Sequence, residues 1–188
     1  MSKIIRALYT AQTIRVYQAY NDLIADEALD LQKFGSNFKM SRMTWIKPSF
    51  LWMMYRSGWA TKANQTRILA IDMLRVGFDK IVNQAVCSSF HENKDLKQAW
   101  AEAIRDSQAR VQWDPERDIY GKPIKDVRSI QLGIRGDLLR QFNDEWIVNI
   151  SDITEFVLEQ SDLVKTGRID QLRLPDEKEY LILPEPEK

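Results

Sequence analysis

Histidine and cysteine are scarce in this chain, and their scarcity excludes several kinds of catalytic site. The 188 residues include one histidine, His91, and one cysteine, Cys87. A zinc site built on these residue types needs more ligands than two, and one cysteine allows no disulfide within the chain. A Ser-His-Asp triad would depend on His91, which stands in the polar run 88–94 and is more typical of a surface histidine.

Glycine is also sparse, and it never occurs in the spacing of a phosphate-binding loop. The seven glycines form neither a G-x-G-x-x-G motif nor a Walker motif, which excludes Rossmann and P-loop nucleotide sites. The apolar runs are far shorter than the roughly 20 residues that span a bilayer. Because the N-terminus lacks an apolar signal region and cysteine is nearly absent, we expect a cytoplasmic protein without membrane contact. A formal net charge of zero argues against a protein that coats DNA nonspecifically.

The order of the expected elements indicates an α+β fold. Strands are expected at 13–20, 43–47, 67–72, 110–113, 128–134 and 145–150. Helices are expected at 22–31, 49–57, 78–86, 96–105, 137–142 and 152–163, with a turn-rich loop at 114–123. The mixture lacks a regular βαβ alternation, which predicts a mostly antiparallel sheet with flanking helices. We expect a single domain at 1–170 and a C-terminal tail at 171–188, with a short strand and an acidic, proline-rich end.

The most informative feature is a stretch without acidic residues. No Asp or Glu occurs from residue 31 to residue 71, and this range is called the acid-free stretch below. It contains seven cations: Lys33, Lys39, Arg42, Lys47, Arg56, Lys62 and Arg67. Three of the six tryptophans, Trp45, Trp52 and Trp59, lie among them. Aromatic rings among cations suit a ligand with flat bases and phosphates, such as a nucleotide, a dinucleotide or a nucleic acid.

Individual side chains of this region have two interpretations. Four cations are candidates to hold a pyrophosphate, since arginine binds phosphate oxygens in pairs: Arg6, Arg42, Lys47 and Arg56. Four aromatic side chains are candidates to stack on a base: Trp45, Trp52, Tyr55 and Trp59. The alternative is an amphipathic element whose aromatic side chains are core and whose cations are solvated.

Four sequence runs resemble the motifs of the domain-of-unknown-function family 4291. These runs lie at residues 16–20, 43–59, 111–117 and 144–148. The resemblance covers nearly the whole chain and is specific, but it implies no activity.

The chain is also similar in plan to the ADP-ribosyltransferase superfamily. Tyr17-Gln18-Ala19-Tyr20 precedes a helix, as the first strand of those enzymes does, and Trp45 lies in a strand before a second helix. Asn143-Asp144-Glu145-Trp146-Ile147-Val148 resembles the strand that carries their catalytic glutamate. The resemblance implies that NAD is the substrate, that Glu145 is the catalytic carboxylate, and that Gln18 and Trp45 flank the nicotinamide. Gln18 and Trp45 replace the histidine and the tyrosine that are usual in that superfamily.

This resemblance implies transfer of ADP-ribose to an acceptor. The sequence does not identify the acceptor, and nucleic acid is one candidate. The transition state is oxocarbenium-like, and a nearby carboxylate stabilises it. If Trp146 and Val148 face the core, strand alternation turns Glu145 toward a cleft or toward solvent, where the alternative is an ordinary solvated glutamate. No metal is expected in this site. The residues expected to bind NAD are Arg6, Tyr17, Arg42, Lys47, Ser49, Tyr55 and Arg56.

Two other hypotheses start from different residues. Asp114, Glu116 and Asp118 alternate along the predicted loop and could bind Mg²⁺ in a nuclease or phosphotransferase, because Mg²⁺ takes oxygen ligands. A plain turn-rich loop explains the same three residues. The segment from Trp45 to Trp59 could instead form a non-enzymatic surface that stacks the bases of RNA or of a nucleotide. The sequence leaves the oligomeric state open.

Overall fold

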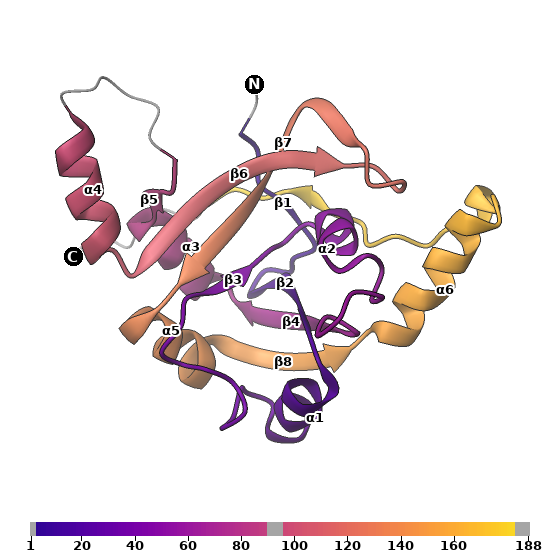
Figure 1. Ribbon diagram of the computed structural model, residues 1–188, viewed down its shortest axis with the longest axis horizontal. Helices are drawn as coiled ribbons and strands as arrows, with labels where there is room; N and C mark the ends of the chain where they lie inside the picture. Colours follow the sequence, from indigo (N-terminus) through magenta and orange to yellow (C-terminus); the bar gives the residue numbers. More distant parts are fainter. Residues whose placement is uncertain (1–2, 90–95, 183–188) are drawn as a thin grey trace.

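Two sheets form the body of the protein in the computed structural model, which describes residues 3–89 and 96–182 (Figure 1). The first has the order β2 (Thr13–Tyr20), β4 (Arg67–Leu74), β8 (Ile147–Asp152). The second has the order β3 (Thr44–Ile46), β7 (Pro123–Ile134), β6 (Ala109–Arg117), β5 (Val86–Cys87). Within the described ranges, only the short β5–β6 pairing is parallel. The structure is a single, mostly antiparallel α+β domain, which confirms the predicted fold class.

Helices flank these sheets. Six α-helices occur in the described residues: α1 (Asp22–Leu31), α2 (Phe50–Ser57), α3 (Arg75–Gln84), α4 (Lys97–Asp106), α5 (Gly136–Gln141) and α6 (Thr154–Lys165). A π-helix, η2 (Phe142–Trp146), follows α5, and a 3-10 helix, η3 (Ile169–Gln171), follows α6. Helices α4 and α6 lie at opposite ends of the molecule in Figure 1. In the part of the chain that is described, no helix is long and apolar enough to cross a bilayer.

Strand β4 is the central strand of the first sheet, and it is buried on both faces. Leu69 and Ile71 belong to the main core, whereas Ile68 and Ala70 pack in a second cluster around Phe50 of α2. Covering both faces of a strand explains its continuous apolar sequence, which does not alternate with polar residues. Helix α2, which forms part of the site, thus shares this second cluster with β4.

The packing of α3 makes a prediction about Gly77. Alanine is usually better than glycine inside a helix by roughly 0.5–1 kcal/mol. A Cβ at Gly77, however, would overlap the indole of Trp146. We therefore expect Gly77→Ala to lower the free energy of unfolding by about 1–3 kcal/mol, measured by urea denaturation. A variant more stable than the parent protein would contradict this packing.

The two sheets meet where β2 passes β3. The Tyr17 backbone N–H donates to the Lys47 carbonyl oxygen at 2.7 Å, which forms an isolated antiparallel bridge. The Gln18 side chain adds a bond from Nε2 to the Trp45 carbonyl oxygen at 3.0 Å. This seam brings together side chains from separate parts of the sequence, and the candidate site lies there.

Two segments differ from the sequence-based expectation. Strand β6 continues through Arg117, where a loop was expected from residue 114; β5 pairs with β6 only as far as Val111, so Pro115 lies on a free edge beside a bulge. The expected strand at 145–150 begins only at Ile147, because η2 continues through Trp146.

The reason for the helical conformation before β8 is burial. Phe142, Asn143 and Trp146 are all buried, with the spacing of one helical face. The Asn143 amide also accepts the Phe34 backbone N–H at 2.7 Å and donates to the Phe34 carbonyl at 3.1 Å. Trp146 is buried but Val148 is 53% exposed, so the condition that both side chains face the core is not met.

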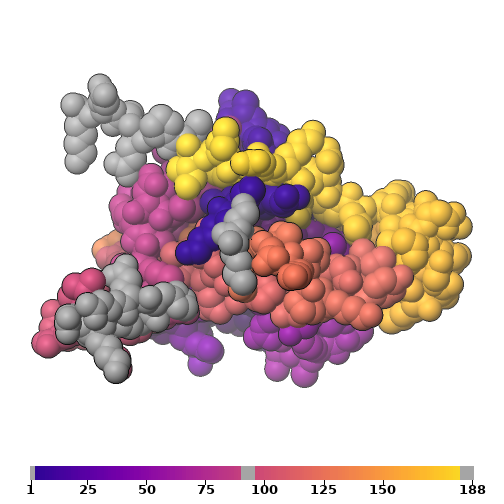
Figure 2. Space-filling view, turned by 90° about the horizontal axis from the view of Figure 1, so that it is seen from above, coloured from indigo at the N-terminus to yellow at the C-terminus, as the bar shows by residue number. Residues whose placement is uncertain are grey.

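The C-terminal segment lies beside the N-terminus, as Figure 2 shows. Strand β1 (Arg6–Ala7) pairs with β9 (Lys178–Glu179), which precedes the apolar residues 180–182 of the tail. Tyr180 is buried, and its hydroxyl donates to Asp79 Oδ1 at 2.6 Å. The acidic, proline-rich end at 183–188 and His91 lie outside the described residues.

Candidate functional site

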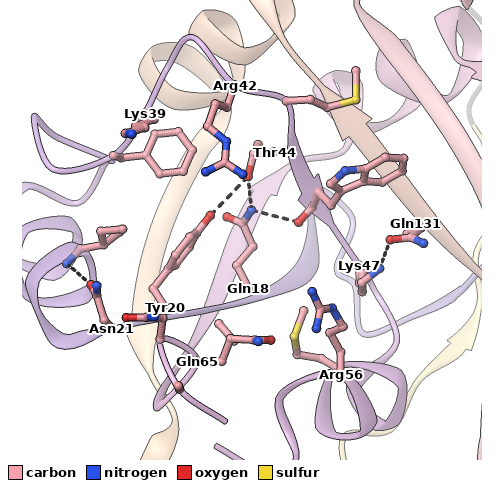
Figure 3. Close-up of a pocket in the computed structure, with 18 of the residues that line it drawn as sticks. Gln18, Tyr20, Asn21, Lys39, Arg42, Thr44, Lys47, Arg56, Gln65 and Gln131 are labelled. Atoms are coloured by element: carbon pink, nitrogen blue, oxygen red, sulfur yellow. Dashed lines mark hydrogen bonds between the residues drawn. The ribbon is translucent and has the colours of Figure 1, made fainter.

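A cavity of about 760 Å³ opens at the seam between the two sheets (Figure 3). Strands β2 and β3, helix α2 and the segments at 37–43 and 63–65 form most of its wall. Four basic side chains line the cavity: Lys39, Arg42, Lys47 and Arg56. Among the described residues the lining includes no Asp or Glu. The acid-free stretch thus folds into one concave, positively charged surface.

The two arginines of the lining are exposed and available to a ligand. Figure 3 shows Arg42 and Arg56 on opposite sides of Gln18. Neither guanidinium takes part in an ion pair within residues 3–89 and 96–182. By contrast, Arg67 of the same stretch contacts three aspartates. Unpaired arginines at a cavity attract anions and bind phosphate oxygens through their planar forks.

Gln18 has a buried acceptor without a partner. Its side chain is 3% exposed, and Nε2 donates to Thr44 Oγ1 at 2.8 Å and to the Trp45 carbonyl at 3.0 Å. Both amide protons are thereby engaged, and Oε1 has no hydrogen-bond partner in the described structure. Tyr20 Oη lies 3.3 Å from Thr44 Oγ1 and extends this polar wall. A buried acceptor of this kind favours a ligand that brings an N–H or an O–H group.

Lys47 differs most from what the sequence suggested. Its side chain is 3% exposed, its Nζ donates to Gln131 Oε1, and the same atom lies 3.4 Å from the centre of the Trp52 ring. Burial lowers the pKa of Lys47 to about 6; the charge of Asp114 opposes this shift and that of Arg56 adds to it. At neutral pH this side chain is therefore mostly an uncharged amine, whereas the sequence suggested a phosphate-binding cation.

A carboxylate below the cavity fixes two glutamines. Asp114 accepts hydrogen bonds from Gln112 Nε2 at 2.8 Å and from Gln131 Nε2 at 2.6 Å. Because Gln131 donates to Asp114, its carbonyl oxygen is turned toward Lys47. Strand register brings these residues together: Gln112 of β6 pairs with Gln131 of β7.

Five of the ten predicted site residues line this one cavity: Gln18, Arg42, Trp45, Lys47 and Arg56. Sequence reasoning did not select several other lining residues: Lys39, Tyr20, Thr44 and Gln112. Lys39 already carried a signal, since it belongs to the acid-free stretch. The polar uncharged residues carried none, because only the strand register places them at the cavity.

The other five predicted residues lie elsewhere: Arg6, Tyr17, Ser49, Tyr55 and Glu145. Arg6 is in β1, and Tyr17 points to the opposite face of β2 from Gln18, where it packs on Phe50 at 5.6 Å. Tyr55 lies outside the cavity, and the Arg117 guanidinium carbon lies 3.8 Å from the centre of the Tyr55 ring. Glu145 is exposed in η2 and is not part of the lining.

The expected stacking surface is only partly present. Trp45 and Trp52 line the cavity, but Trp52 is buried beneath Lys47. Trp59 packs edge-on against Phe50 at 6.1 Å in the second hydrophobic cluster. Trp45 is therefore the tryptophan that offers a partly exposed ring to a ligand.

Ser49 and two glutamates meet at the start of α2. Ser49 Oγ accepts the Trp52 N–H at 3.2 Å and donates to Glu116 Oε1 at 3.0 Å. The Phe50 N–H donates to Glu177 Oε1 at 2.7 Å. Burial raises the pKa of Glu177 to about 8, the Phe50 N–H opposes this shift, and the charge of Glu116 adds to it. Ser49 is thus a helix cap, which accounts for its position without a ligand.

The three acids of the metal hypothesis have separate partners. Asp114 binds the glutamines and Glu116 binds Ser49, while Asp118 Oδ1 accepts the backbone N–H groups of Tyr120 and Lys122 within a turn. No group of three His, Cys, Asp or Glu side chains with metal-binding geometry occurs in the described residues. The structure therefore does not bring Asp114, Glu116 and Asp118 together as the hypothesis requires.

The fold and the cavity define an α+β protein with a positively charged, partly aromatic site at the junction of two sheets. Residues 4–180 match a family described as a domain of unknown function (DUF4291), and the chain belongs to this family, as its four sequence runs predict. Comparisons with curated proteins and with solved structures gave no match. The similarity in plan to ADP-ribosyltransferases stays a prediction.

Proposed function

We propose that the cavity binds a nucleotide, and that NAD or a related dinucleotide is its ligand. The observation that carries this proposal is a lining with three cations, Lys39, Arg42 and Arg56, and no described acid around an unpartnered amide oxygen. The volume of about 760 Å³ lies within the range of small-molecule sites, which is about 300–1,000 Å³.

Each part of a nucleotide has a matching group in the wall. Arg42 and Arg56 are placed to bind phosphate oxygens, and the partly exposed ring of Trp45 offers a flat surface to a base. Gln18 Oε1 accepts a hydrogen bond from a carboxamide, an amino group or a ribose hydroxyl. A dinucleotide such as NAD carries all of these groups in one molecule.

Transfer of ADP-ribose makes a further demand, because it needs a carboxylate beside the ribose. Glu145 does not line the cavity, so the geometry supports nucleotide binding more directly than a Glu145-dependent transfer. We expect Glu145→Gln to leave NAD affinity unchanged within about twofold, since surface substitutions away from a site have small effects. A tenfold weaker affinity, measured by calorimetry, would place Glu145 in the binding site.

Calorimetric titration with NAD, ADP-ribose, ATP and a short RNA tests the proposal itself. We expect saturable binding of NAD or another nucleotide with one site per chain. The hypothesis of an RNA-binding module predicts instead that only the RNA binds and that its affinity falls steeply with salt. That second outcome would overturn the nucleotide proposal.

A further inference from the structure

We propose that Lys47 is a nucleophile that condenses reversibly with an aldehyde group on a phosphate-bearing ligand of this cavity. The inference rests on the proposed function for its phosphate contacts, and it adds a covalent step and a substrate class. The class comprises phosphorylated aldehydes, and within it we favour a nucleotide with a free reducing ribose, such as ADP-ribose. Its open-chain form carries the aldehyde at C1.

Two neighbouring groups can engage the N–H bonds of an uncharged Lys47 Nζ. An uncharged amine nitrogen has two N–H bonds and one lone pair in addition to its bond to Cε. One N–H points to Gln131 Oε1, and the Trp52 ring, whose centre lies 3.4 Å from Nζ, can accept the other. In this proposal the lone pair takes the remaining direction, toward the cavity that Lys47 lines.

Neighbouring groups hold this arrangement. Asp114 accepts from Gln131 Nε2 at 2.6 Å, so the Gln131 amide presents its oxygen, and not its NH₂ group, to Lys47. Gln131 is therefore a positioning residue in this proposal. Arg56 lines the same cavity and disfavours a second positive charge at Nζ. A desolvated lysine beside another cation is an established way to obtain a reactive amine at neutral pH.

The proposed step balances without any oxidant or reductant. The Nζ lone pair attacks the carbonyl carbon, the carbonyl oxygen takes up a proton, and nitrogen loses one, which gives a carbinolamine. The hydroxyl group then leaves as water as nitrogen loses its second proton and the C=N bond forms. One amine and one aldehyde thus give one imine and one water, while Arg42 and Arg56 hold the phosphates.

Reductive trapping tests this inference on the full-length protein. The protein is incubated with ADP-ribose, with ribose 5-phosphate or with pyridoxal 5′-phosphate, and cyanoborohydride then reduces any imine to a stable amine. Intact mass and peptide mapping locate the adduct. We expect one adduct on Lys47 whose formation rate rises through about pH 6, whereas exposed lysines react only as pH approaches their ordinary pKa of about 10.4. If ADP-ribose labels Lys47 more efficiently than ribose 5-phosphate does, the nucleotide is the preferred source of the aldehyde.

Matched variants complete the test. Lys47→Arg keeps a long basic side chain but removes the reactive amine, and we expect at least tenfold less labelling. Lys33→Arg changes an exposed lysine of the acid-free stretch that lies outside the lining, and this variant should label like the parent protein. Saturating NAD should protect Lys47. Peptide mapping of the parent protein decides the question even if a variant fails to fold.

Labelling spread over exposed lysines with Lys47 unmodified would overturn the inference. If NAD still bound with one site per chain, only the covalent step would fall. If no nucleotide bound and Lys47 were nevertheless labelled by pyridoxal 5′-phosphate, the amine would be reactive and the nucleotide proposal would fall instead.

Discussion

Replacing Arg42 or Arg56 with alanine is expected to weaken nucleotide binding about ten- to a hundredfold in each case. Both guanidinium groups line the cavity and form no ion pair within the described residues. A hydrogen bond to a charged group contributes about 1.5–3 kcal/mol, and about 1.4 kcal/mol corresponds to tenfold in affinity. Titration calorimetry of each variant with the nucleotide that binds the parent protein measures the effect.

Lys33→Ala is the matched control for these two variants. Lys33 also belongs to the acid-free stretch, but it lies outside the lining and contacts Asp144 at 3.4 Å on the surface. We expect its removal to change affinity less than twofold, since exposed ion pairs contribute little. An equal loss in all three variants would show that general electrostatic attraction, and not the cavity, holds the ligand.

The second large effect concerns Lys47 and the dependence of stability on pH. The folded protein lowers the pKa of Lys47 to about 6 through burial, from 10.5 in the unfolded chain. Between these two values the unfolded state binds more protons, so the free energy of unfolding rises with pH. Across this pH window, the titration of Lys47 raises the free energy of unfolding by on the order of several kcal/mol. Below pH 6 the amine becomes charged in both states, and the penalty of burying it is then complete.

Lys47→Met isolates this contribution, because methionine keeps an apolar stem without an amine. Its free energy of unfolding should depend on pH less steeply than that of the parent protein between pH 6 and pH 10. Urea denaturation of both proteins at several pH values measures the difference, in which all other titrating groups cancel. Parallel curves for the two proteins would show that Lys47 is solvated and charged when folded.

Much of the framework could be predicted because local chemistry determines it. Asn21 Oδ1 accepts the Ile24 N–H at 3.1 Å at the start of α1, and Ser49, which was predicted as an NAD-binding residue, caps α2 in the same way. Such caps act within one helical turn and are therefore visible in the sequence. The acid-free stretch likewise marked the cations of the cavity, because it supplies most of one wall.

What could not be predicted depends on contacts between distant segments. Gln112 and Gln131 reach the cavity through the β6–β7 register, and the neutral amine of Lys47 follows from burial beside Trp52. The π-helix that removes Glu145 from the expected strand is held by the contact of Asn143 with Phe34, 109 residues away in the chain. Strand alternation alone contains no information about such contacts.

Tryptophan fluorescence during titration with NAD shows whether a nucleotide binds at the seam between the sheets. Trp45 and Trp52 line the cavity, so a ligand there changes their emission. We expect a saturable change with NAD or another nucleotide. The change should be smaller in Trp45→Phe, and the affinity should be weaker in Gln18→Leu, which removes the buried amide acceptor. An unchanged spectrum with every nucleotide, in a folded protein, would contradict a nucleotide site at this seam.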